Sequence, residues 1–193
     1  NNEVFSSVAG IEIENSSNAL VTNNSAHHNT GGIMVFVLPN NPSKIGEHTR
    51  VVNNRVWSNN HENFGKPGTA VSFIPPGLGM LVMAADYTEV TQNIIEDNKS
   101  FGISVLSVKN ASSLQGKEYT LDIQPDPDHT LIHNNTYINN GYDPAQRYID
   151  LAGGGGDLYW DGSGEGNAWS EAAGVKTVPA QLPKPPSHAD SGD

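Results

Sequence analysis

The chain has 193 residues, with 10 Lys and Arg against 21 Asp and Glu, which gives a net charge of −11. This charge argues against nucleic acid as a partner, because surfaces that bind nucleic acid are basic. The absence of cysteine excludes disulfides, thiolate metal ligands and cysteine nucleophiles, and no apolar stretch is long enough to span a membrane. Asparagine and glycine are unusually frequent, at 22 and 20 residues. Both favour turns over helices.

The asparagines recur in a register along the chain. Five of them serve as anchors of successive repeats: Asn2, Asn24, Asn54, Asn93 and Asn134. A small or β-branched residue follows two positions after each anchor, and Ser7, Asn29, Asn59, Asn98 or Asn139 follows five positions after it. Such self-similarity indicates a repeat architecture.

Each of the first four repeats continues with a glycine and a short strand pattern, at residues 10–13, 32–35, 79–82 and 102–105. Strand alternation places the first and third residues after each glycine inside the fold. A second interior column is predicted three residues before the anchors, at Val21, Val51, Val90 and Leu131.

The anchor spacings of 22, 30, 39 and 41 residues reduce to a unit of 22 residues with three insertions. These lie at roughly 38–48, 60–78 and 107–129. The first and third insertions interrupt the same segment of the repeat, so we expect them to lie close together. The second should emerge from another edge. A unit of 22 residues cannot bury its own apolar face and must stack on its neighbours.

This pattern resembles the right-handed parallel β-helix family, the pectin-lyase-like solenoids, over residues 1–142. The resemblance implies an all-β solenoid of about five coils with long inserted loops, in which equivalent asparagines stack as ladders. The leucine-rich repeat, its rival at this period, needs repeated leucines and a helical half-repeat that the chain lacks. The resemblance also implies an exported protein, periplasmic or extracellular, and a polysaccharide lyase or C5-epimerase-like activity.

Several positions that should face outward from the main strands are apolar, namely Met34, Phe36, Leu81, Met83 and Leu106. Such a patch indicates cover or contact. The inserted loops could fold over it, two copies of the chain could join through it, or it could bind an apolar ligand.

A second outward column is predicted at Phe5, His27, Trp57, Glu96 and Tyr137. Its rings could stack against sugars or against one another as an outer ladder. His27, Trp57 and Tyr137 are therefore candidate substrate-binding residues, together with the loop lysines Lys44 and Lys66.

The run Asp126-Pro127-Asp128-His129 is similar to the Asp-Pro-His-Asp motif of β-helical alginate epimerases, with Asp and His exchanged. The resemblance suggests acid–base catalysis by Asp126, Asp128 and His129, and Lys117 of the same insertion is a further candidate. Asp-Pro-Asp is also ordinary turn chemistry.

Residues 143–175 leave the register and are interpreted as a C-terminal strand and cap that hides the last coil behind Trp160 and Trp169. Within them, Asp161, Ser163 and Glu165 match the first positions of a calcium loop, although the final glutamate is missing, so Ca²⁺ is a possible cofactor. Residues 176–193 are proline-rich and predict a disordered tail. Because the chain begins in register with neither a signal peptide nor a cap, we expect it to be part of a longer β-helix.

The sequence therefore predicts an exported β-helix that binds or modifies a polysaccharide in a groove shaped by the insertions. The alternatives are a non-catalytic β-helix that serves as a scaffold or partner-binding module, and a metal-handling exported protein.

Overall fold

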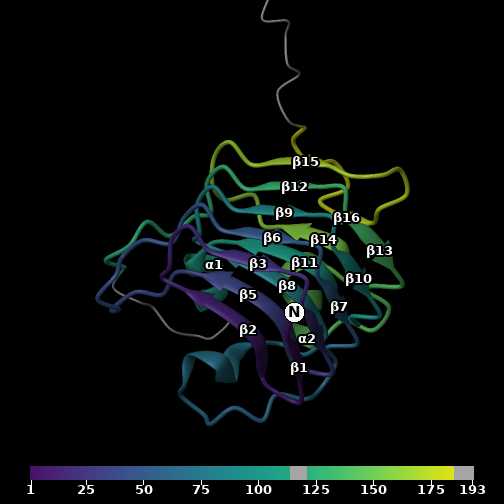
Figure 1. The fold of residues 1–193 in the computed structure, drawn as a ribbon, viewed down its shortest axis with the longest axis horizontal. Helices are drawn as coiled ribbons and strands as arrows, with labels where there is room; N and C mark the ends of the chain where they lie inside the picture. Colours follow the sequence, from purple (N-terminus) through teal and green to yellow (C-terminus); the bar gives the residue numbers. More distant parts are fainter. Residues whose placement is uncertain (114–120, 185–193) are drawn as a thin grey trace, which may run out of the picture.

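The computed structural model describes residues 1–113 and 121–184, which form a parallel β-helix of five coils (Figure 1). Each coil contributes one strand to each of three parallel sheets. Sheet A contains β1 (Glu3–Phe5), β4 (Ser25–His27), β7 (Arg55–Trp57), β10 (Ile94–Glu96) and β13 (Thr136–Ile138). Sheet B contains β2 (Ala9–Glu14), β5 (Gly31–Phe36), β8 (Leu78–Met83), β11 (Phe101–Leu106), β14 (Gly156–Trp160) and the short β16 (Thr177–Val178). Sheet C contains β3 (Leu20–Thr22), β6 (Arg50–Val52), β9 (Glu89–Thr91), β12 (Leu131–His133) and β15 (Ala168–Ser170).

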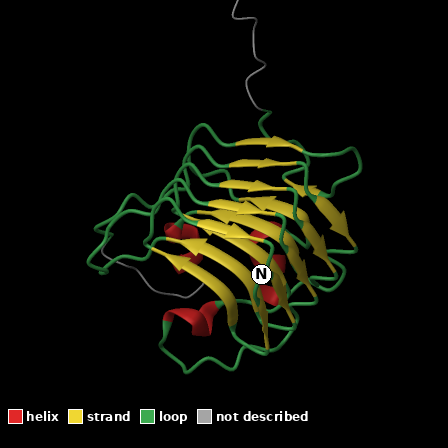
Figure 2. Ribbon diagram, viewed as in Figure 1, coloured by secondary structure: helices red, strands yellow, loops and turns green. Residues whose placement is uncertain are grey.

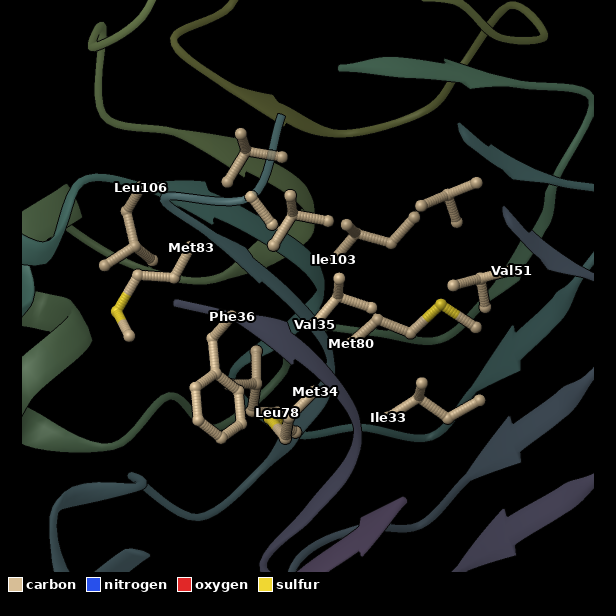
Figure 3. Packing of buried hydrophobic residues seen from close by; sticks show 14 of the residues in the cluster. Ile33, Met34, Val35, Phe36, Val51, Leu78, Met80, Met83, Ile103 and Leu106 are labelled. Atoms are coloured by element: carbon tan, nitrogen blue, oxygen red, sulfur yellow. The ribbon is translucent and has the colours of Figure 1, made fainter. Parts of the chain in front are cut away.

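The core runs along the inside of the coils. In sheet B, Ile33 of β5 lies beside Met80 of β8, which lies beside Ile103 of β11, and all three are buried. Figure 3 shows these side chains on the inner face of the sheet, together with Val51 from sheet C. The predicted strand alternation is confirmed here, because equal positions in successive coils stack at the spacing of parallel strands.

The fifth coil is shifted by one residue from the predicted register. Tyr137 rather than Thr136 pairs with Ile95, and Ile132 rather than Leu131 pairs with Val90. The anchor of this coil is consequently Asn135 and not Asn134.

The shift has a physical reason in the paired asparagines of the turns. The residue before each anchor from the second coil onward has a left-handed backbone: Asn23, Asn53, Gln92 and Asn134 have φ of 56°, 58°, 58° and 55°. Asparagine tolerates this conformation better than most residues. The two asparagines of a doublet therefore have different tasks, and in the fifth coil the sequence pattern selected the wrong one.

The anchors form a continuous hydrogen-bonded ladder. The side-chain amide of Asn24 donates to Asn54 Oδ1 at 3.0 Å, Asn54 donates to Asn93 at 3.0 Å, and Asn93 donates to Asn135 at 2.9 Å. Asn135 donates in turn to the carboxylate of Glu171 at 2.8 Å. The backbone N–H of each anchor from Asn2 to Asn93 bonds to the same oxygen as its side chain, so a single acceptor satisfies two donors.

A second ladder follows the residues five positions later. It runs through Asn29, Asn59, Asn98 and Asn140 with side-chain bonds of 3.0–3.1 Å. It ends on Asp157, which accepts from Asn140 at 3.1 Å. Asn140 takes the place predicted for Asn139, because the same one-residue shift applies to this turn.

The insertions emerge from the two opposite ends of the sheet B strands. Insertions one and three follow the ends of β5 and β11, and they meet where Lys44 pairs with Asp122 and where the Asn40 N–H donates to Asp122 at 3.1 Å. Insertion two precedes β8, and a further segment (residues 141–155) precedes β14. Three short helical segments belong to these excursions: η1 (Ala70–Phe73), α1 (Val108–Ser113) and α2 (Gln146–Ala152), drawn red in Figure 2. In the described part of the chain, no helix has the length and apolar character required to cross a membrane.

The predicted cap, residues 143–175, contributes strands that continue two of the sheets. Strand β14 continues sheet B beside β11, and β15 continues sheet C beside β12. Trp169 is buried and contacts Trp160, with ring centroids 5.1 Å apart. The first part of the predicted tail also belongs to the fold. Strand β16 pairs with β14, and the backbone N–H of Trp169 donates to the carbonyl of Pro183 at 3.0 Å. Residues 185–193 of that prediction lie outside the described residues.

Candidate functional site

The outward face of sheet B is apolar and largely covered. Met34, Phe36, Met83 and Leu106 are all buried, although strand alternation turns them away from the core. Figure 3 shows them on the side of the sheet opposite to Ile33, Met80 and Ile103. The first of the three predicted explanations is therefore confirmed: the insertions fold over the patch.

The cover is incomplete and leaves a cleft of about 110 Å³ above the sheet. Met34 and Leu81 belong to its floor. Insertion two contributes Phe73 and Ile74 to one wall. The remaining lining comes from β2, β5, β8, β11, insertions one and two, α1 and α2: Glu12, Phe36, Leu38, Pro39, Ala70, Val71, Pro75, Leu78, Met83, Leu106, Val108, Ala111, Ser112, Arg147, Tyr148 and Leu151. Insertions one and three follow the ends of β5 and β11, and insertion two and α2 precede β8 and β14, so the cleft is walled from both ends of the strands.

Helix α2 is fixed over the sheet by Tyr148. Its hydroxyl lies 3.1 Å from Ser104 Oγ on the outward face of β11, and its ring packs edge-on against Phe101 at 4.9 Å. Burial raises the pKa of the Tyr148 phenol well above its ordinary value of 10.0. The neutral phenol therefore anchors α2 to the outward face of β11.

Two lining side chains carry charge, Glu12 and Arg147. Burial raises the pKa of the Glu12 carboxyl from its ordinary value, and the neighbouring Glu14 raises it further. Arg147 donates from Nη1 to the carbonyl of Phe73 at 3.0 Å, which connects α2 to insertion two. Arg147 forms no ion pair with any residue that the structure describes.

The candidate catalytic pair Asp128 and His129 lies in a turn between sheets B and C, outside the lining of this cleft. The Asp128 carboxylate accepts from the Glu165 N–H at 2.8 Å and from Gln124 Nε2 at 2.5 Å. The His129 ring stacks on Tyr87 with centroids 4.7 Å apart. Both side chains thus join successive coils.

The pKa of the candidate catalytic carboxyl Asp126 is shifted. Burial raises its pKa, the nearby Lys109 lowers it, and the carboxylates of Asp128 and Asp161 raise it, with a net upward shift. Asp126 does not line the cleft. The fourth candidate, Lys117, lies outside the described residues.

Two of the candidate sugar-binding rings, His27 and Trp57, belong to an aromatic stack on sheet A. His27 lies between Phe5 and Trp57, at centroid distances of 5.5 and 4.2 Å and with interplanar angles of 10° and 22°. The Arg55 guanidinium carbon sits 4.5 Å from the Trp57 centroid. Since His27 already covers one face of Trp57 in near-parallel stacking, Arg55 must occupy the other. A sugar needs an open ring face, so the outer-ladder interpretation fits better.

Tyr137 does not belong to this column. The one-residue shift places Ile138 beside Glu96 and turns Tyr137 toward the core, where its hydroxyl donates to Glu171 at 2.8 Å. Burial and the adjacent Glu171 carboxylate raise the pKa of Tyr137. Its predicted position on the outer surface is therefore wrong.

The loop lysines lie apart from the cleft and from each other. Lys44 is paired with Asp122 between insertions one and three. Lys66 is exposed in insertion two, and its carbonyl accepts from the Thr69 N–H at 3.1 Å. The structure does not bring them together into one basic surface.

The residues of the predicted calcium loop already have partners within the protein. One oxygen of Asp161 accepts from the Ser107 N–H at 2.8 Å and from Asn110 Nδ2 at 2.6 Å, and the other accepts from the Ser163 N–H at 2.9 Å. Within the two described ranges, no cluster of three or more His, Asp or Glu side chains could hold a metal ion. Metal binding through Asp161, Ser163 and Glu165 remains a sequence-based prediction.

Two residues that complete the cleft, Arg147 and Tyr148, were not among the predicted site residues. They lie in a segment that had left the repeat register and was assigned to a strand and cap. The sequence did contain one indication of them: the segment between Asn140 and the next strand of sheet B is long enough to form a helix over the sheet.

Comparison with known proteins supports the architecture. A family model described as a right-handed β-helix region matches residues 1–168. No curated protein and no solved structure matches the chain. The match extends through β14 and reaches the first residue of β15, in agreement with the five coils. The chain is a member of the right-handed β-helix family.

Proposed function

We propose that the protein is a binding module that holds an apolar ligand in the cleft over sheet B. The observation that carries this proposal is the composition of the cleft: floor and walls are formed almost entirely by apolar side chains. Ligand sites in proteins are typically concave and mostly apolar, with few polar groups that orient the ligand. The cleft of about 110 Å³ is smaller than the roughly 300 Å³ or more of such sites, so it encloses only part of a ligand and leaves the rest at its open mouth. The two charged side chains and Tyr148 fit that description.

Polysaccharide binding or modification, which the resemblance implies, finds less support in this geometry. A sugar chain presents many hydroxyls, and burying them without partners is costly. The cleft offers few polar groups, and Asp128 and His129 lie in a turn outside it. Dimerisation through the outward face of sheet B also loses support, because the insertions already cover Met34, Phe36 and Met83.

The proposal is tested with 1-aminoanthracene, an uncharged fluorophore that brightens in apolar sites. We expect saturable binding by the purified protein. Leu81→Gln places an amide on the floor of the cleft and should weaken binding about tenfold or more, as expected when an apolar contact becomes an unpaired polar one. Ile94→Gln, on the exposed outer face of sheet A, is the matched control and should bind normally.

Circular dichroism melting of both variants separates loss of binding from loss of fold. Absence of saturable binding to the folded protein would overturn the proposal, as would equal binding by both variants. The exported location implied by the resemblance is likewise a proposal, and fractionation of cells that express the protein tests it.

A further inference from the structure

We infer that the ligand is an amphiphile with an unbranched acyl chain and a terminal carboxylate, and that Arg147 binds the carboxylate. The inference rests on the proposed function and assigns the ligand class for the same cleft. It follows from the backbone of the floor, the position of Arg147 and the position of Glu12.

The floor of the cleft offers no free hydrogen bonds from its backbone. Strands β5, β8 and β11 are inner strands of sheet B, each paired on both sides. An extended peptide in the cleft would bury its own N–H and C=O groups above a surface that cannot bond them, at considerable cost. A hydrocarbon chain has no such groups, so the floor favours an acyl chain over a peptide.

Arg147 supplies the polar end of the site. Its guanidinium carries five N–H donors, of which Nη1 donates to Phe73 O at 3.0 Å. This bond fixes the side chain at the wall of the cleft, and no described carboxylate is ion-paired with it. A guanidinium bordered by Phe73 and Ile74 is well suited to bind a carboxylate through charge-assisted hydrogen bonds, because low local polarity strengthens them.

The other charged side chain of the cleft is Glu12. Glu12 is on β2, whereas α2 packs over β11 through Tyr148 and Ser104. Two strands, β5 and β8, lie between β2 and β11, so the floor extends for roughly 14 Å across the strands. The apolar tail of a ligand bound at Arg147 has Leu81 and Met34 beneath it.

Displacement of 1-aminoanthracene by dodecanoate, dodecanol and dodecylammonium tests the assignment. We expect dodecanoate to bind about tenfold or more tightly than dodecanol, and dodecylammonium to bind more weakly than either, as expected for a charged hydrogen bond at one end of an apolar site. Arg147→Gln should abolish the preference for dodecanoate while retaining dodecanol, and Arg147→Lys should retain part of it. Glu12→Gln should strengthen dodecanoate binding, since a like charge is removed.

Arg55→Gln is the matched control, because Arg55 lies on sheet A outside the cleft and its loss should leave the preference unchanged. Equal affinity for dodecanoate and dodecanol in the unmodified protein would overturn the inference and leave the proposed function standing. The inference is also overturned if Arg147→Gln keeps the preference for dodecanoate. Failure of all three amphiphiles and of 1-aminoanthracene to bind would instead overturn the proposed function itself.

Discussion

The Asn53–Asn54 doublet allows the two roles of asparagine in the turns to be separated by experiment. Asn54 is buried in the ladder, whereas Asn53 is exposed and has a left-handed backbone with φ of 58°. We predict that Asn54→Ala strongly destabilises the protein and that Asn53→Gly, one residue away, does not.

The magnitude follows from the bonds that Asn54 makes. Its Oδ1 accepts from the backbone N–H and the side-chain amide of Asn24, both at 3.0 Å. Its own amide donates to the carbonyl of Val21 at 2.9 Å and to Asn93 Oδ1 at 3.0 Å. Alanine leaves two buried donors of Asn24 without an acceptor, at about 1–3 kcal/mol each, so the expected loss is about 4 kcal/mol. Glycine at position 53 adopts the left-handed backbone without a steric penalty, so its effect should stay below about 1 kcal/mol.

Urea unfolding followed by circular dichroism measures both free energies of unfolding. The unmodified protein and Asn53→Gly should have similar midpoints, and Asn54→Ala should unfold at clearly lower urea. If Asn54→Ala lost less than about 1 kcal/mol, or if Asn53→Gly were the more damaging change, the assignment of roles within the doublet would be refuted.

Two further predictions concern the spacing of the coils and their response to acid. Gly32→Ala places a Cβ against the carbonyl oxygen of Gly79 in the next coil, and it should cost about 1–3 kcal/mol of unfolding free energy in the same urea assay. For Glu89, burial raises the carboxyl pKa, but hydrogen bonds from Arg50 and His133 lower it more, so the net shift is below the ordinary value of 4.5. The unfolded chain then binds the proton more readily, and this contribution to stability, present above pH 4.5, is lost as the pH falls through the lower folded pKa. Glu89→Gln should therefore reduce the loss of unfolding free energy in acid by less than about 1 kcal/mol, since the site is partly exposed. If unfolding free energy fell with pH in the variant as it does in the unmodified protein, the ion pairs of Glu89 with Arg50 and His133 would lose support.

The fold was predictable because each rung repeats the same residue types at fixed spacing. The glycine at the second position of the sheet B strands is a clear case: in the second coil, Gly32 has no room for a side chain beneath the next coil. The predicted register of the fifth coil was wrong by one residue because Asn134 and Asn135 fit the repeat pattern of the sequence equally well. Only the left-handed backbone at Asn134 distinguishes them.

The candidate site was predictable only in part. The outward apolar positions and their cover by insertions follow from strand alternation and from the place where each insertion interrupts the coil. The identity of the wall does not, because α2 has seven residues and no side-chain cap hydrogen bond at its N-terminal end. Its position depends on contacts with sheet B, such as Tyr148 with Ser104, that arise between distant segments.

The two asparagine ladders give the solenoid a chemical direction. Each inner asparagine donates N–H groups to the next coil and accepts through its oxygen from the preceding coil. As far as these hydrogen bonds are concerned, any inner coil is therefore interchangeable with its neighbours. A duplicated coil between Asn24 and Asn135 would continue the chain of amides without a mismatch. The last rungs differ, because Glu171 and Asp157 accept from Asn135 and Asn140 but their carboxylates have no N–H to pass on. A designer who lengthens this protein by concatenating coils should therefore insert them before these carboxylates. A copy of Glu171 or Asp157 within the array would interrupt the ladder, because its carboxylate cannot donate to the next coil.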